Sequence, residues 1–268
     1  MERKRRRSIE NLGLSQGDKT QIKKLLNKPS GLIVVAAPAG NGKTTTLISV
    51  IPYQSKNIFA IESSIETVLP HVSQTLVSRD GPNSYQSALE NIDSQDTDVI
   101  MVDTIASDKE IQLTIDLAGA NLMLTSIPFE NAAQVIMHLI RSQGDSMSVA
   151  HTLKMVISQR LVPLICSNCK IIHSKSRELA DKINIPQDIK LQRGAGCPRC
   201  YFTGRKGRVM LFQTVFIDDK FAELIANNPT FSQLVNHIKR TGKYGFRYDA
   251  LIKCQRGWIH PEDVLKFS

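Results

Sequence analysis

A glycine-rich turn stands between two apolar stretches near the start of the chain. It reads Ala37-Pro38-Ala39-Gly40-Asn41-Gly42-Lys43-Thr44, and it matches the phosphate-loop pattern G-x-x-x-x-G-K-[ST] except that Ala37 replaces the first glycine. In such a loop, backbone N–H groups and the start of the next helix bind phosphate oxygens. The alternative is an ordinary glycine-rich turn. We expect nucleotide contacts from these residues: Ala39, Gly40, Asn41, Gly42, Lys43, Thr44 and Thr45.

Within this loop two side chains have specific expected roles. The Lys43 ammonium is expected at the β- and γ-phosphates of ATP, and the Thr44 hydroxyl is expected as a ligand of Mg²⁺. A third residue, Asp103, follows the apolar run Val99–Val102. An aspartate at a strand tip beside a phosphate loop commonly holds Mg²⁺ through water. The alternative for Asp103 is a strand-ending residue that caps the next turn.

Two C-x-x-C pairs are separated by 27 residues in the second half of the chain. Four thiolates in this arrangement suit tetrahedral Zn²⁺, and with all four positions filled the zinc would be structural rather than catalytic. A redox-active pair and incidental cysteines are the alternatives. The fifth cysteine, Cys254, is expected to be a small core residue. The predicted zinc ligands are Cys166, Cys169, Cys197 and Cys200.

The elements that position these groups alternate between short apolar runs and helical patterns, which is typical of a parallel α/β sheet. The predicted strands are Gly31–Ala37, Asn57–Glu62, Asp98–Asp103 and Asn121–Ile127. Helices are predicted around 85–92, from the capping box at Ser107 to about Ala118, and over Asn131–Ser142 and Val149–Arg160. After Leu164 the composition changes to cysteine pairs, basic glycine turns and further helices. We therefore divide the chain into a basic tail (1–14), a phosphate-loop domain (15–164), a zinc-binding module (165–213) and a helical C-terminal subdomain (214–268).

Composition bounds the remaining possibilities. The chain has 268 residues, of which 41% are hydrophobic, so a proper core is available. No apolar run approaches the ~20 residues of a membrane span, and the start MERKRRR has no apolar segment of a secretory signal. These features predict a cytoplasmic protein with reduced or metal-bound cysteines. The net charge is +9, and Arg3–Arg7 form a basic cluster. This cluster suits nucleic acid, an anionic membrane or a solvated tail, and basicity does not choose between them.

Together, the phosphate loop and the tetracysteine motif resemble the secretion ATPase superfamily of type II secretion and type IV pilus assembly. Matching segments include PSGLIVVAAPAGNGKTTTL, NIFAIESSIETVLP, VISQRLVPLICSNCK and CPRCYFTGRKGRVMLFQTVFIDD, so the resemblance covers nearly the whole chain. The N-terminal docking domains of the family are not found in it. The resemblance implies a RecA-like fold, the cofactors ATP, Mg²⁺ and Zn²⁺, and a homo- or hetero-hexamer. It also implies a platform protein of the inner membrane as partner, with peripheral membrane contact, and nucleic acid is not expected as a partner.

The departures from the family pattern fall on hydrolysis. Thr104 stands at the Walker B glutamate, and Ala106 and Ser107 follow where arginine and aspartate are expected. Pro128 stands at the His-box histidine, and Glu90 and Ser94 replace two arginines. The segment that resembles the Asp box keeps Glu62 and Glu66, but it has Ser63-Ser64 in place of Asp-Pro. An arginine finger alone is worth ~10³–10⁵ in rate, so these losses predict slow turnover.

Three functional hypotheses follow. The first is an ATP-binding subunit or regulator of a secretion or pilus apparatus with weak or no hydrolysis. The second is an active motor for pilin or pseudopilin assembly, in which Glu62 and Asp103 are the catalytic candidates. The third is a zinc-stabilised protein that binds nucleic acid or a membrane surface and has a vestigial loop. The sequence leaves open whether the chain is an enzyme.

Overall fold

The computed structural model describes residues 8–51, 56–78, 81, 83–92, 96–174, 176–241 and 245–267. Arg3–Arg7 and Ser94 therefore lie outside the described residues. The chain forms two compact units: unit 1 comprises Met1–Ser158 and Thr214–Thr241, and unit 2 comprises Gln159–Gln213 and Gly242–Ser268. The presence of two compact units does not test the four-part division of the chain, which stays a prediction.

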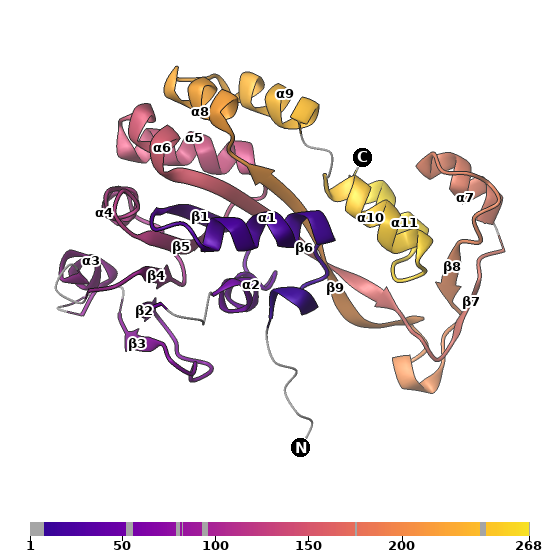
Figure 1. Ribbon diagram of the computed structural model, residues 1–268. Coiled ribbons are helices and arrows are strands. Elements are labelled where there is room, and N and C mark those ends of the chain that lie inside the picture. Colours follow the sequence, from indigo (N-terminus) through magenta and orange to yellow (C-terminus); the bar gives the residue numbers. More distant parts are fainter. Residues whose placement is uncertain are drawn as a thin grey trace. The chain divides into compact units, whose positions relative to one another are not determined.

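A seven-stranded sheet with the order β3-β2-β4-β5-β1-β6-β9 runs through the described residues (Figure 1). Neighbouring strands from β3 to β6 pair in parallel, as expected for an α/β sheet. Because the strands are parallel, the turns that follow β1, β2, β4 and β5 gather at one edge of the sheet. The strands are β1 (Gly31–Ala36), β2 (Ile58–Glu62), β3 (Ser73–Leu76), β4 (Val99–Val102), β5 (Leu122–Ile127), β6 (Leu153–Ile165) and β9 (Arg205–Phe216).

The central strands are apolar and buried on both faces. Every residue of β1, β4 and β5 is buried, and the three strands align with Gly31 opposite Leu122 and Leu122 opposite Val99. Continuous β-branched runs of this kind are typical of strands covered by helices on both sides. The four predicted strands are thereby confirmed as β1, β2, β4 and β5. The edge strand β3, which is short and largely exposed, was not predicted.

Helices of unit 1 begin where the sequence offers capping side chains. The Ser107 capping box starts α4 (Asp108–Leu117) as predicted, and Asn131 caps α5 (Ala132–Gln143). Their apolar faces join one core cluster with the sheet, as do α8 and α9 through Phe221 and Leu234. The other helices of this unit are α1 (Gln16–Leu26), α2 (Lys43–Val50), α3 (Tyr85–Glu90), α6 (Ser146–Thr152), α8 (Asp219–Ala226) and α9 (Phe231–Thr241), after a short 3₁₀ turn, Ile9–Asn11.

The helix predicted over Val149–Arg160 is wrong. Helix α6 ends at Thr152 and strand β6 begins at Leu153, where it pairs with β1 in the register Val34 to Val156. Most residues of the first half of β6 are buried. A short apolar run buried on both faces has no period that separates strand from helix, and here the pairing with β1 decides the outcome.

Unit 2 has its own core and a two-stranded antiparallel sheet. Strands β7 (Lys170–Ile172) and β8 (Gln192–Gly194) pair with Ile171 opposite Arg193. The core includes Leu179, Leu211 and Ile259, and Cys254 is 1% exposed within it, as expected of a small core residue. The helices are α7 (Ser176–Ile183), α10 (Phe246–Gln255) and α11 (Pro261–Val264), with 3₁₀ turns at Pro198–Cys200 and Leu265–Phe267. Among all described helices, none combines the length and apolar character needed to cross a membrane.

Candidate functional sites

The turn after β1 has the strand–turn–helix geometry that the loop pattern predicts. Gly40 and Gly42 adopt left-handed backbone torsions, with φ of 73° and 80°, and Gly42 is the N-cap of α2. Glycine meets this need without steric cost. Ala37 is buried, its N–H donates to the Ile127 carbonyl at 3.3 Å, and it does not have a positive φ. The alanine is therefore accommodated where the usual pattern has glycine.

The start of α2 is open to an anion. Most helices of unit 1 have an N-cap side chain that accepts a hydrogen bond from the first turn, as Ser107 does in α4 and Asp218 in α8. Gly42 provides no such bond in α2, and a Cβ added at Gly40 would meet open space. The first N–H groups of a helix have no partner within the helix, and together with the positive end of the helix they favour a bound phosphate. These features fit a nucleotide phosphate.

The side chains of the turn are also of the types that bind phosphate and Mg²⁺. The Lys43 ammonium donates to the Ala37 carbonyl at 3.1 Å and lies across the turn, while burial lowers its pKa. The Asn41 amide donates to the Ala39 carbonyl at 3.2 Å and helps to hold the turn in shape. Thr44 and Thr45 occupy the first turn of α2 and are half-buried. Together they place an ammonium and a hydroxyl at the helix start.

Asp103, just beyond β4, is held by donors from the protein itself. One carboxylate oxygen accepts from the Ser63 N–H at 2.9 Å and from the Ser63 hydroxyl at 2.8 Å. The other accepts from the hydroxyl of Tyr85, at the start of α3. Burial, followed by this bond, raises the pKa of Tyr85, so the phenol remains a proton donor. Both oxygens of Asp103 therefore have protein partners.

Glu62, the last residue of β2, is 2% exposed. Its carboxylate accepts from the Gln74 amide of β3 at 2.7 Å. Burial raises the pKa of Glu62, the Gln74 bond opposes that rise, and the charges of Asp103 and Glu66 add to it. The Gln74 amide is also fixed by the Thr67 carbonyl at 3.1 Å. Glu62 and Asp103 thus lie close enough for their charges to interact, but each carboxylate has its own hydrogen-bond partners.

The phosphate-binding turn and the carboxylate cluster follow different strands of the same edge. Strand β5 lies between β1 and β4, so two strand spacings of ~4.8 Å separate β1 from β4 by roughly 10 Å. Thr104, at the position expected for a catalytic acid, donates to the Asp103 carbonyl at 2.7 Å and contacts Ser126. Sequence reasoning missed Gln74 and Tyr85. Their contacts join residues 12 and 18 positions apart, and no local pattern encodes them.

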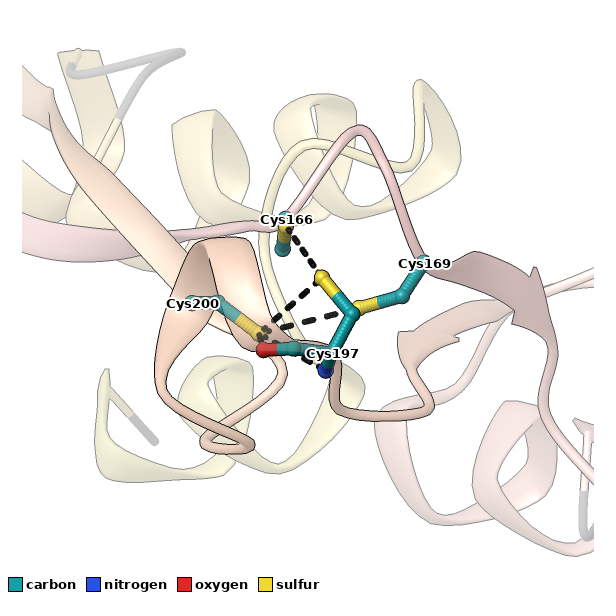
Figure 2. Close-up of side chains that lie close together, drawn as sticks. All are labelled: Cys166, Cys169, Cys197 and Cys200. Atoms are coloured by element: carbon teal, nitrogen blue, oxygen red, sulfur yellow. Dashed lines mark hydrogen bonds between the residues drawn. The ribbon is translucent and has the colours of Figure 1, made fainter.

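In unit 2 the predicted cysteines form one cluster, with side chains that point toward a common centre (Figure 2). The sulfur atoms of Cys166 and Cys197 lie 3.9 Å apart, those of Cys169 and Cys200 3.8 Å, and those of Cys197 and Cys200 3.7 Å. A disulfide needs ~2.05 Å. Tetrahedral Zn–S bonds of ~2.3 Å place sulfurs ~3.8 Å apart. The spacing therefore fits four thiolates around one zinc ion.

Donors around Cys197 and Cys200 favour the thiolate form, whereas burial raises the pKa of Cys169 to about 11. The Cys197 N–H donates to the Cys200 sulfur at 3.2 Å, and the Asn168 amide donates to the Cys197 sulfur at 3.4 Å. Burial raises the pKa of Cys200, but backbone N–H groups of Cys197 and Gly204 outweigh it and lower the pKa to about 6. The backbone also crosses closely here, since a Cβ at Gly194 would lie 2.0 Å from the Gly204 carbonyl oxygen. Glycine is required at that crossing.

The chain is similar to known secretion and pilus proteins. The family model described as Type II/IV secretion system protein matches residues 1–266. The type IV pilus assembly ATPase PilB of Thermus thermophilus is 29% identical over 265 residues, 96% of this chain and 30% of PilB. The type II secretion system protein E of Pseudomonas aeruginosa is 28% identical, over 98% of this chain and 53% of its own length. The chain thus spans about half, or less, of the curated relatives that it matches.

Solved structures share the fold. The Legionella pneumophila ATPase DotB superposes with a TM-score of 0.71 at 17% identity, covering 97% of this chain and 66% of that one. The pilus retraction motor PilT, solved with bound ADP, gives a TM-score of 0.72 at 22% identity with the same coverage. The α/β fold predicted from the resemblance, RecA-like with a cysteine cluster and a helical C-terminal part, is confirmed.

Proposed function

The chain belongs to the type II/IV secretion system protein family, and we propose that it binds ATP with Mg²⁺ and hydrolyses it weakly or not at all. In this proposal it acts as a subunit or regulator of a secretion or pilus apparatus. One contrast carries the proposal. The helix start beside Lys43 is open to phosphate, whereas the carboxylates of Glu62 and Asp103 are bonded to protein donors.

The binding residues follow from the geometry of the turn. Main-chain groups from Ala39 to Gly42 and the Lys43 ammonium would hold the phosphates, and Thr44 would hold Mg²⁺. The bound metal neutralises phosphate charge. Hydrolysis further requires a group that orients water and cations that stabilise the transferred phosphoryl group. Thr104 and Pro128 cannot supply an acid or an imidazole at the family positions, and Glu90 cannot supply a cation.

Assembly and location are proposed from family membership. We place the protein at the cytoplasmic face of a bacterial inner membrane, in a homo- or hetero-hexamer that contacts an inner-membrane platform protein. Within unit 2, Cys166, Cys169, Cys197 and Cys200 would bind one structural zinc ion. The zinc ion would hold together the two C-x-x-C pairs, which lie on either side of residues 170–196.

The test pairs two measurements on one sample. Titration calorimetry with Mg·ATP should give binding heat for the wild type and little for Lys43→Ala, with Lys23→Ala as a matched surface control. Phosphate release should stay below ~0.1 s⁻¹, whereas typical enzymes turn over at ~1–10³ s⁻¹. Faster release by the protein alone, abolished by Lys43→Ala, would contradict weak hydrolysis.

A second candidate, an active motor for pilin assembly, is favoured by one observation. Glu62 and Asp103 lie in one cluster at the edge that carries the phosphate-binding turn. Rapid phosphate release lost in Glu62→Gln and Asp103→Asn would support it. A third outcome, no heat from Mg·ATP together with salt-sensitive DNA binding, would identify the loop as vestigial.

A further inference from the structure

The positive charge of the chain is concentrated around the cysteine cluster. The segment Gln159–Gln213 contains eleven lysines and arginines but three acidic residues, against a net charge of +9 for the whole chain. From Ile189 to Ile217 there is no acidic residue at all, while six basic residues occur. Even after a zinc–tetrathiolate centre contributes two negative charges, this segment stays strongly cationic. Its chemistry suits an anionic surface.

Two aromatic side chains project from the turn that follows the last cysteine. Tyr201 is 88% exposed and Phe202 is 73% exposed, the former being the most exposed large hydrophobic side chain of the described residues. Singly exposed apolar residues are ordinary, but adjacent aromatic rings exposed to this degree form an apolar projection. We call Tyr201 and Phe202 the knuckle tip.

The backbone of the knuckle tip is strained and firmly held. Tyr201 and Phe202 have φ of 51° and 58°, in the left-handed region that is unfavourable for a residue other than glycine. The Tyr201 N–H donates to the Pro198 carbonyl at 3.2 Å, and the Phe202 N–H donates to the Cys197 carbonyl at 2.9 Å. Glycine or asparagine would fit these torsions with less strain. Stability therefore does not account for two exposed aromatic residues here.

Exposed cations flank the knuckle tip. Arg199 lies between the paired cysteines, and Lys206 and Arg208 follow the tip; all three are exposed. Arg205 differs, because its guanidinium bonds the buried Asp263 at 2.5 Å and links the end of the turn to α11 within unit 2. The knuckle tip thus has three exposed cations close to it in sequence, and its backbone is held by hydrogen bonds.

We propose that the knuckle tip is a membrane anchor that inserts Tyr201 and Phe202 into the headgroup region of an anionic bilayer. Arg199, Lys206 and Arg208 would bind the lipid phosphates around it. Aromatic rings favour this interfacial depth, and each cation near an anionic surface adds roughly fivefold in binding. The proposal deepens the membrane-peripheral location proposed above, but it is independent of nucleotide binding, so either can fail alone.

A lipid surface explains the arrangement better than a nucleic acid strand. Proteins that bind single strands space aromatic platforms along a positively charged groove, so that successive bases stack. Here two rings are adjacent on one projecting turn, which suits insertion of both into the same layer. Nucleic acid binding is therefore an outcome that the experiment must be able to reveal.

The experiment is co-sedimentation of the full chain with phosphatidylcholine vesicles, with or without phosphatidylglycerol. Arg3–Arg7 are changed to glutamine in every protein, so that the basic tail does not contribute. Tyr201→Asn/Phe202→Asn is expected to lower partitioning onto anionic vesicles at least ~10-fold, since burying a Phe side chain is worth ~1.5–3 kcal/mol. Lys206→Gln/Arg208→Gln is expected to lower it ~25-fold at low salt. Asparagine accepts left-handed torsions, so the first variant should keep its zinc and fold.

Matched controls remove the same chemistry elsewhere. Val68→Ser/Leu76→Ser takes away exposed apolar area, and Lys239→Gln/Arg240→Gln takes away exposed charge; both should partition like the parent. A direct test is Tyr201→Trp in a Trp258→Phe background, whose fluorescence should be quenched by brominated acyl chains. The proposal is overturned if the tip variant partitions normally or the indole is not quenched. It is also overturned if a single-stranded oligonucleotide displaces the vesicles and needs the same residues.

Discussion

Two groups of acidic side chains are arranged in opposite ways in this chain. In unit 2, four thiols point at one another, with sulfur–sulfur distances of 3.7 to 3.9 Å. At the sheet edge of unit 1, Glu62 and Asp103 instead accept hydrogen bonds from Gln74, Ser63 and Tyr85. Thiolates that face one another require a cation, whereas these carboxylates already accept hydrogen bonds from the protein.

This difference underlies the proposed separation of nucleotide binding from hydrolysis. The cysteine cluster keeps the geometry of a working metal site, and the turn before α2 keeps the geometry of an anion site. The carboxylates of Glu62, at the end of β2, and Asp103, after β4, instead accept hydrogen bonds from neighbouring protein groups. A motor needs its carboxylates free to handle water and metal. This contrast is the reason why we propose that the chain binds nucleotide but turns it over slowly or not at all.

The largest expected effect tests the metal side of the comparison. Cys200→Ser should abolish stoichiometric zinc and unfold unit 2, because structural zinc supplies about 10–16 kcal/mol of apparent binding free energy in small domains. Metal analysis and amide hydrogen exchange of 159–213 measure both effects. Cys254→Ala, which changes a buried cysteine outside the cluster, should keep its zinc. Unchanged metal content and exchange protection in Cys200→Ser would show that the sulfurs do not bind zinc.

The next effect tests the carboxylate side. Tyr85→Phe removes the hydroxyl donor to Asp103, and a hydrogen bond to a charged group is worth about 1.5–3 kcal/mol. We expect a lower urea midpoint by a corresponding amount, while Tyr201→Phe, at an exposed phenol, should change nothing. If the bond withholds Asp103 from magnesium, phosphate release by Tyr85→Phe should also rise. Wild-type stability in Tyr85→Phe would mean that Asp103 is not held in this way.

The features that the sequence predicted depend on residues close together in the chain, whereas the features that it missed depend on contacts between distant residues. The phosphate-binding turn and each cysteine pair are encoded within a few residues, where glycine torsions and C-x-x-C spacing dictate local geometry. The helix predicted over Val149–Arg160 failed because pairing with β1 overrode an ambiguous apolar run. Strand β9 was also missed, because its basic, glycine-containing start does not alternate between apolar and polar residues.

The hydrogen-bond partners of the acidic residues also could not be predicted from the neighbouring sequence. Asp103 was expected either to hold magnesium or to cap the next turn, and its observed partners, Ser63 and Tyr85, come from other elements. Those partners are set by the order of strands in the sheet. A sequence pattern can therefore identify a carboxylate at a strand end without showing whether the fold leaves it free.

A smaller expected effect is on zinc affinity, through the hydrogen-bond donors to the cysteine sulfurs. Burial raises the pKa of Cys197, the Asn168 amide lowers it, and the net shift is downward. Asn168→Ala should weaken zinc binding by about 10-fold, at the lower end of the range for residues that support metal ligands. Competition with a chromophoric chelator measures this, with the exposed neighbour Ser167→Ala as control. Equal zinc affinity in both variants would mean that the sulfurs need no such donor.

The smallest effect is a pH dependence of stability at Glu62. Burial raises its pKa above the ordinary 4.5, so the folded state takes up a proton more readily than the unfolded state. The stability linked to this group is present below about 4.5 and is lost as pH rises through the raised pKa. Glu62→Gln keeps an oxygen for Gln74 but cannot ionise. Its urea midpoint should match the wild type in acid and exceed it near neutral pH, while Glu223→Gln, at an exposed position that does not act on the pKa of Glu62, should follow the wild type throughout. If the urea midpoint of Glu62→Gln instead changed with pH as that of the wild type does, Gln74 would fully stabilise the ionised carboxylate. Glu62 would then be ionised and available for chemistry.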